Sequence, residues 1–299
     1  MRSDRLHLLV IAATACAMLG ARSSALSEVV LHTEKSLYRN VTVTEQDGER
    51  CMKFSRYYQG SRQSCIFVND RSRLVFPYTK MMLASLYLSP SPKRVLVVGL
   101  GGGTLPDALL RIYPDIEMDV VEVDAAVIRV AQKYFDFRPG PNVHIFEEDG
   151  RVFVKRAARK GAKYDLVLLD AFDHEYIPEH MLTREFLQEV KTVMQPDGVL
   201  AANTFSTSRL YAHESATYEA VFGRFYNLKD ANRIILVKLD GLPSQGVLTS
   251  NASSLDDKLA AAGAASEWLL PMFTSGRDWP AGTRILTDQY SPANLLNVQ

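Results

Sequence analysis

The sequence of 299 residues has little cysteine and no excess of charge of either sign. Its 34 basic side chains balance its 34 acidic ones, so no basic face is implied and nucleic acid is a poor candidate for a partner. The chain has no internal repeat and no Ser-His-Asp or Cys-His nucleophile pattern. Histidines and glutamates gather at 174–180, but their spacing matches no familiar ligand pattern, so we expect no metal site.

The N-terminus carries an apolar run, residues 6–21, that is short for a stable transmembrane helix. Arg2 and Arg5 precede this run and small residues follow it up to Ala25, which is the pattern of a secretory signal. We expect residues 1–25 to be removed and the mature chain to be exported, periplasmic or secreted, with no stable membrane span. A buried N-terminal helix in a cytoplasmic protein is the alternative.

Residues 26–76 are predicted to form a small antiparallel β-domain, because short β-branched runs such as 29–32 and 41–44 are separated by turn residues. Removal of the signal would leave two cysteines in the chain, Cys51 and Cys65. An even pair in an exported protein can form a disulfide across a hairpin. Two buried free thiols are an equally good interpretation.

Residues 77–299 are predicted to form a second, larger domain. A helix at 78–87 precedes a regular alternation of strands and helices, which is typical of a doubly wound, mainly parallel sheet. Residues 241–266 are rich in alanine, serine and glycine and are predicted to be a loosely held excursion. The predicted strands are 94–98, 119–123, 143–146, 164–169, 198–203 and 233–238, and the predicted helices are 104–112, 125–134, 151–159, 183–194 and 213–222.

A glycine cluster follows the first of these strands. Four apolar residues run into Gly99, Gly101 and Gly103, and glycines let the backbone turn sharply and approach a ligand closely. Thr104 stands where the third glycine of a dinucleotide-binding fingerprint would fall. The turn therefore favours an adenosyl-sulfonium ligand, such as S-adenosylmethionine, over NAD.

Carboxylates follow the next three strands of the predicted sheet. Ligands of open α/β sheets bind outside the carboxyl ends of the strands. Glu122 suits the hydroxyls of a ribose, and Asp149, followed by Gly150, suits the amino group of adenine. Asp170 and Asp173 would face the reacting end of the ligand.

Together these motifs resemble the spermidine synthase (polyamine aminopropyltransferase) family, and most of all its divergent, spermidine synthase-like branch. The resemblance covers residues 30–240 and implies a Rossmann-like fold of the S-adenosylmethionine-dependent methyltransferase type, with a small N-terminal β-domain. It implies that Asp170 holds the amine nucleophile and accepts its proton, with Tyr78 near the amine. It also implies that Glu122 binds the ribose of the donor and that Asp149 binds its adenine.

The amine half of the predicted site departs from the pattern of the family. Synthases that use putrescine carry an aspartate where this sequence has Gly102. The family tyrosine is followed by Gln or His and then Glu, whereas Tyr78 is followed by Thr79 and Lys80. A dication needs several carboxylates to replace its hydration, so these departures fit a monoamine or a larger substrate at least as well as putrescine.

The sequence thus predicts a transferase that moves an aminopropyl group from decarboxylated S-adenosylmethionine to a small amine. Methyl transfer from S-adenosylmethionine is an alternative, because the glycine turn and the acidic strand ends serve either donor. An exported nucleoside- or polyamine-binding protein without turnover is a second alternative, since sulfonium donors are made in the cytosol. We also expect a homodimer.

Overall fold

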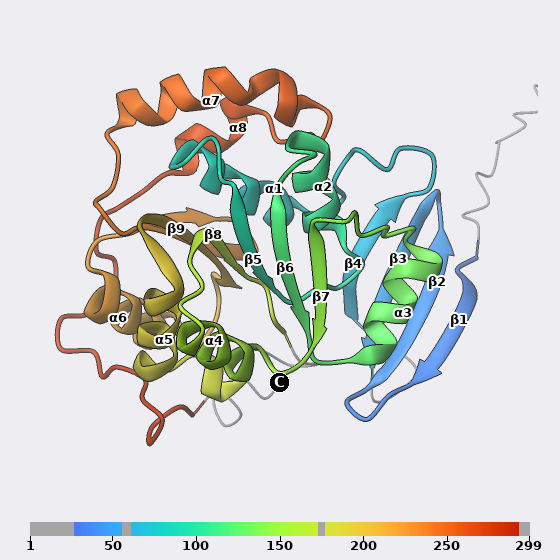
Figure 1. Ribbon diagram of the computed structural model, residues 1–299, viewed down its shortest axis with the longest axis horizontal. Coiled ribbons are helices and arrows are strands. Elements are labelled where there is room, and N and C mark those ends of the chain that lie inside the picture. The colour runs from blue at the N-terminus through green and yellow to red at the C-terminus, as the bar shows by residue number, and fades with distance from the viewer. Residues whose placement is uncertain (1–26, 56–60, 173–176, 293–299) are drawn as a thin grey trace, which may run out of the picture.

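The computed structural model describes residues 27–55, 61–172 and 177–292. It contains a four-stranded sheet and a seven-stranded sheet (Figure 1). The predicted signal sequence, residues 1–25, lies outside the described residues. No helix in the described part of the chain is long and apolar enough to cross a membrane.

The small N-terminal sheet is antiparallel throughout, in the order β1-β2-β3-β4. Asp47 and Gly48 form the two-residue turn between the second and third strands, and both have positive φ angles, 51° and 79°, as a tight hairpin requires. One face of the sheet is covered by α3, which buries Val43 and Met52 against Val130. The strands are β1 (Val29–Lys35), β2 (Asn40–Gln46), β3 (Glu49–Ser55) and β4 (Ser61–Phe67).

The large sheet has the order β10-β11-β9-β8-β5-β6-β7. Its five strands from β9 to β7 run parallel, while β11 is antiparallel to both of its neighbours. The prediction of a doubly wound, mainly parallel sheet is therefore confirmed. The strands are β5 (Arg94–Val98), β6 (Glu117–Glu122), β7 (Val143–Glu147), β8 (Tyr164–Leu169), β9 (Met194–Phe205), β10 (Tyr226–Lys229) and β11 (Asn232–Lys238).

Helices cover both faces of the large sheet, because its central strands are apolar on both sides. Alternate residues of β5 point to opposite faces: Val95 and Val97 pack with the layer of α1, α2 and α7, and Leu96 and Val98 pack with α4 and α5 (Figure 1). The longer helices are α1 (Pro77–Leu83), α2 (Thr104–Ile112), α3 (Ala125–Tyr134), α4 (Gly150–Arg159), α5 (Arg184–Val193), α6 (Tyr211–Phe222) and α7 (Gln245–Ala260). The shorter helical segments are η1 (Ala84–Tyr87), η2 (Glu179–Met181), α8 (Ser266–Leu269) and η3 (Leu270–Met272).

The prediction of a loosely held excursion at 241–266 is wrong. Helix α7 occupies most of this segment, and the side chain of Ser244 caps its first turn. Its buried residues, Leu248, Ala252, Leu255 and Leu259, recur every three or four positions and so form one apolar face. The many small residues between them hid this periodicity, although alanine is the best helix former.

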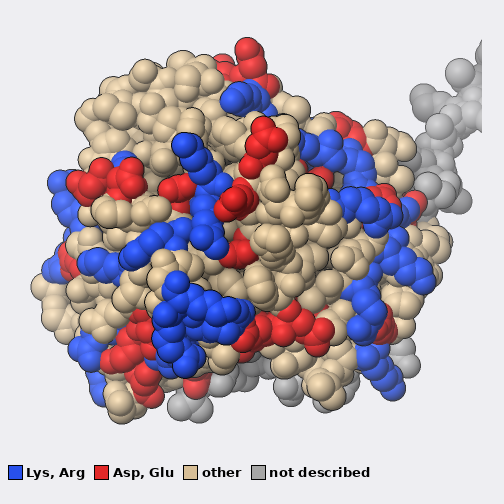
Figure 2. All heavy atoms as spheres, viewed as in Figure 1, with Lys and Arg blue, Asp and Glu red and all other residues tan. Residues whose placement is uncertain are grey.

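Charged side chains of both signs are interspersed over the face of the molecule shown in Figure 2. Helix α4 contributes a basic group of Lys155, Arg156 and Arg159, in which Lys155 pairs with Glu189 and Arg156 pairs with Glu148. The balanced composition is thus reflected locally in ion pairs on this face.

Candidate active site

The glycine turn closes the carboxyl end of β5 against the end of β8. A Cβ on Gly99, whose φ is 99°, would lie 2.2 Å from the carbonyl oxygen of Asp170, so any larger residue would push the two strand ends apart. Gly101 and Gly103 also have positive φ angles, 53° and 76°, and Gly103 precedes the first turn of α2. Because β5 lies between β6 and β8, this turn sits where the order of the strands reverses, the usual ligand site of such sheets.

A cavity opens above the turn and encloses about 870 Å³, part of it open to solvent. Gly103 does not line the cavity, since a Cβ there would meet the ring of Phe137 behind the turn. The cavity is lined by most of the predicted site residues: Tyr78, Gly99, Gly101, Glu122, Asp149, Gly150 and Asp170.

Glu122 lies at the end of β6, where its carboxylate links the glycine turn after β5 to the residues that follow β6. Its carboxylate accepts hydrogen bonds from the backbone N–H of Leu100 at 3.0 Å and of Asp124 at 3.0 Å. Burial raises the pKa of Glu122, and these two N–H groups oppose that rise. Each carboxylate oxygen keeps a free lone pair, so the group can still accept hydrogen bonds from a diol.

Asp149 caps the N-terminus of α4, where it accepts the N–H of Val152 at 3.0 Å. Its other oxygen lies 2.9 Å from Nε2 of His180. The hydrogen bond with His180 is the main cause that lowers the pKa of Asp149. The residue is thus an ionised helix cap that also lines the cavity.

Asp170 follows β8 and lies at the other end of the cavity, beside Tyr78 of α1. Nδ2 of Asn203 donates to its carboxylate at 2.8 Å, and Nδ2 of Asn232 donates to Oδ1 of Asn203 at 2.9 Å. Burial raises the pKa of Asp170 to about 7, although the hydrogen bonds from Asn203 and Tyr78 work against it. Burial, and then the charge of Asp170, raise the pKa of the Tyr78 hydroxyl well above its usual value, so Tyr78 acts as a neutral donor.

Two side chains in this region were missed by sequence reasoning. Asn203 ends a predicted strand, so the strand-end argument could have found it. Arg39 comes from the N-terminal sheet, lies over the ring of Phe54 and donates to the carbonyl oxygen of Phe172 at 3.1 Å. Only the tertiary fold brings it to the cavity. The predicted catalytic residue Asp173 lies outside the described residues.

The three departures from the family pattern lie outside the cavity lining. A Cβ on Gly102 would lie 2.8 Å from both the Phe135 ring and Oγ of Ser64, so a carboxylate there has no space without movement of its neighbours. Thr79 is buried and bonds the backbone of its own helix. The ammonium of Lys80 lies beside Gly263.

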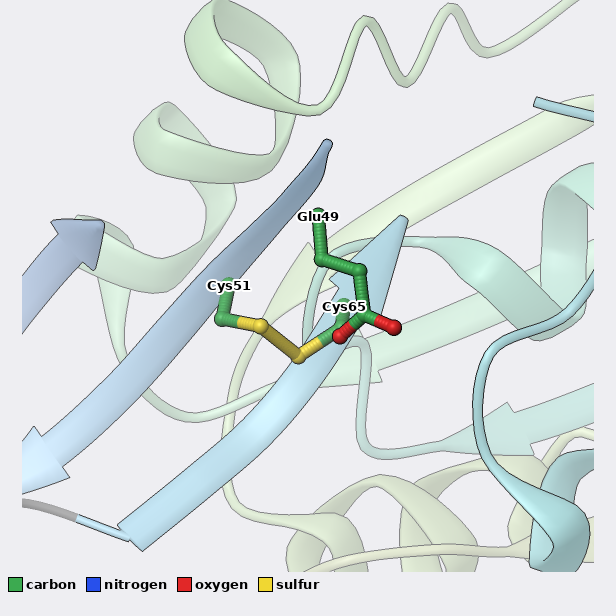
Figure 3. Close-up of side chains that lie close together, drawn as sticks. All are labelled: Glu49, Cys51 and Cys65. Atoms are coloured by element: carbon green, nitrogen blue, oxygen red, sulfur yellow. A yellow bond between two sulfur atoms is a disulfide. The ribbon is translucent and has the colours of Figure 1, made fainter. Parts of the chain in front are cut away.

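Cys51 and Cys65 form a disulfide between paired positions of β3 and β4 (Figure 3). The structure thus decides between the two interpretations of these cysteines. Glu49 lies close to both sulfur atoms, and the three residues are the only group in the described part of the chain with the spacing of a metal site. A disulfide offers no thiolate, and the guanidinium of Arg62 lies against the sulfurs and Glu49, so the group is unsuited to a cation.

The fold and this cavity define a transferase domain of the type that uses S-adenosylmethionine-like donors. Residues 75–236 match the family model of the spermine/spermidine synthase domain. The polyamine aminopropyltransferase of Vibrio vulnificus is 45% identical over 294 residues, which cover 97% of this chain and 98% of that protein. The chain therefore belongs to the spermine/spermidine synthase family.

The fold is shared with solved structures. A probable spermidine synthase from Corynebacterium glutamicum superposes with a TM-score of 0.64 at 19% identity, covering 85% of this chain and 98% of that one. Human methyltransferase-like protein 13, solved in complex with SAH, gives a TM-score of 0.58 at 25% identity, covering 70% and 97%. The predicted family and the predicted fold class are both confirmed.

Proposed function

We propose that the protein transfers the aminopropyl group of decarboxylated S-adenosylmethionine to an amine. One observation carries this proposal: a buried carboxylate with a pKa of about 7, Asp170, lies at one end of a cavity whose other end carries Glu122 and Asp149. A base poised near neutral pH suits the removal of a proton from an amine. The polyamine aminopropyltransferase of Vibrio vulnificus, which matches nearly the whole chain, supports the same activity.

In this mechanism the acceptor nitrogen attacks the aminopropyl carbon that is bonded to the sulfonium sulfur. A C–N bond forms, the C–S bond breaks with its electron pair left on sulfur, and methylthioadenosine is released. The nitrogen gains positive charge as the bond forms, and the Asp170 carboxylate stabilises that charge and takes the proton. Tyr78 and Asn203 hold this carboxylate by donating to it.

Glu122 and Asp149 are assigned to the donor. Glu122 accepts hydrogen bonds from the ribose hydroxyls, and Asp149 accepts one from the amino group of adenine. The glycine turn, with Gly99 and Gly101 in the cavity wall, lets the backbone approach the donor closely. No metal takes part in this scheme.

We further propose that putrescine is a poor acceptor. Among the described residues at the amine end of the cavity, Asp170 is the one carboxylate, whereas a diamine brings a second ammonium that needs its own partners. Gly102 and Lys80 offer none there. A specific activity with putrescine equal to that of a conventional spermidine synthase assayed alongside would contradict this.

Purified mature protein should release methylthioadenosine from decarboxylated S-adenosylmethionine in the presence of a suitable amine, measured by chromatography against a panel of monoamines and polyamines. Release of S-adenosylhomocysteine from S-adenosylmethionine instead would establish methyl transfer.

Export and a homodimer stay predictions. Cell fractionation with N-terminal sequencing tests the removal of residues 1–25, and light scattering tests the dimer.

A further inference from the structure

The C-terminal tail of the described chain is bound to the start of α4, next to the assigned donor site. Arg151, the second residue of α4, is buried and donates five hydrogen bonds. Two go to the carboxylate of Asp288 in the tail, at 2.7 and 2.8 Å, and two to Glu189 of α5. The fifth goes to the backbone carbonyl of His180, at 3.1 Å.

The same tail fixes the segment that carries His180. Asp288 also accepts the hydroxyl of Thr183 at 2.7 Å, and Ser291 donates to the carbonyl of Glu179 at 2.9 Å. The hydrogen bonds from Arg151 and Thr183 lower the pKa of Asp288 to about 2, so this carboxylate is ionised at any physiological pH. Segment 178–183 is therefore held by charged and hydrogen-bonded contacts with the tail and with Arg151.

The same segment also forms part of the cavity wall. Pro178 and Met181 line it, and Met181 packs so close to Gly150 that a Cβ there would lie 3.1 Å from the methyl group of Met181. The ring of His180 returns to Asp149 at 2.9 Å. Since an ionised carboxylate only accepts, Nε2 of His180 must carry the proton and donate.

Asp149, Gly150 and Arg151 are linked to His180 at both ends of this three-residue stretch. Arg151 holds the backbone of His180, and the His180 side chain holds the carboxylate of Asp149, which lies two residues before Arg151. Asp149 is thus fixed at both oxygens, by Val152 N–H on one and by His180 on the other. A carboxylate has about four acceptor positions on its two oxygens, so Asp149, held in this orientation, can still accept a further donor from the cavity that it lines.

We propose that Asp288 of the tail, acting through Arg151 and His180, holds Asp149 in the orientation that reads the 6-amino group of the donor's purine. This inference rests on the proposed function, because it takes Asp149 as the group that binds adenine. His180, Arg151 and Asp288 are then positioning residues for base recognition, and they have no part in the transfer step.

The test compares the dissociation constants of two nucleosides by calorimetry, methylthioadenosine and its 6-oxo counterpart methylthioinosine. Because the 6-oxo group cannot donate to a carboxylate, the wild type should prefer the adenine nucleoside by about ten- to a hundredfold, the usual worth of a hydrogen bond to a charged group. Asp149→Asn should abolish this preference. His180→Ala and Asp288→Asn should each reduce it by about three- to tenfold, since the carboxylate keeps its charge and loses its fixed orientation.

Two variants separate positioning from general loss of structure. His180→Gln keeps an N–H donor and should restore most of the preference. Glu219→Gln removes a surface ion pair between Glu219 of α6 and Arg277 of the C-terminal region. This variant should leave the preference unchanged. Melting temperatures measured alongside show which variants are folded.

Three outcomes would overturn the proposal. If His180→Ala and Asp288→Asn weaken both nucleosides equally while Asp149→Asn abolishes the preference, the contacts are only structural and the donor assignment stands. If Asp149→Asn leaves the preference intact, Asp149 does not read the base, and this inference and the donor assignment fail together. If the wild type binds neither nucleoside, the proposed function itself fails.

Discussion

The pH dependence of turnover should report the ionisation of Asp170. Its pKa is raised to about 7 by burial, so the carboxyl group is protonated and inactive below that pH and becomes an active base above it. With a pKa of about 7, about a tenth of the molecules carry the carboxylate at pH 6 and about nine-tenths at pH 8. The kcat/KM for the amine, which reports ionisations of the free enzyme, should therefore rise about tenfold between these two values from this group alone.

The assay follows methylthioadenosine release from pH 5 to pH 9. In a plot of the logarithm of the rate against pH, the slope for the wild type should fall by one as the pH rises through about 7. Asp170→Asn keeps the shape of the side chain and removes the base, so it should lower turnover by about 10²–10⁴-fold and remove this break in slope. Ionisation of the acceptor amine adds its own slope to both proteins, which leaves the difference between them intact.

Asp165 offers a matched control, because it lies near the start of the same strand, where it accepts the N–H groups of Lys93 and Arg94 at 2.8 Å. Asp165→Asn should leave the break near pH 7 in place. If Asp170→Asn turns over normally, or if its profile keeps that break, the assignment of the base is wrong even though the fold is right.

Three further predictions concern donor binding and stability. Glu122→Ala should weaken methylthioadenosine binding by about 1–3 kcal/mol in calorimetry, and unchanged affinity would remove the ribose assignment. Glu214→Gln should lower the free energy of unfolding by about 3–5 kcal/mol in urea titrations, because it leaves the fully buried guanidinium of Arg233, now 2.7 Å from Glu214, without its counter-charge. Replacement of both Cys51 and Cys65 by alanine should cost about 3 kcal/mol of stability, the expected value for a loop of this length, and a reductant should then have no additional effect.

The sequence predicted the parts of the site that depend on local patterns. Gly99, Glu122 and Asp170 each follow a short apolar strand, and parallel strands bring their carboxyl ends to one edge of the sheet whatever their order. The alternation of strands and helices could likewise be predicted from short stretches of sequence. The same reasoning brought Asp149 to the strand ends that line the cavity, but did not show that it is also a helix cap bound to His180.

The remaining parts depend on contacts between distant segments. Arg39 reaches the cavity only because the N-terminal sheet packs on α3, and Asp288 reaches Arg151 across 137 positions of sequence. The pairing of Cys51 with Cys65 depends on the register of β3 and β4, which spacing alone left open. The sequence next to each of these residues gives no sign of its distant partner, so these contacts could not be predicted from local patterns.

We propose that the chain moves an aminopropyl group and does not move a methyl group. Mass spectrometry of the acceptor amines tests it most directly, with decarboxylated S-adenosylmethionine and S-adenosylmethionine offered separately to the wild type and to Asp170→Asn. We expect an acceptor enlarged by one aminopropyl group, from the decarboxylated donor alone, with the product strongly reduced in Asp170→Asn. A methylated acceptor, or no product with any amine from either donor, would contradict it.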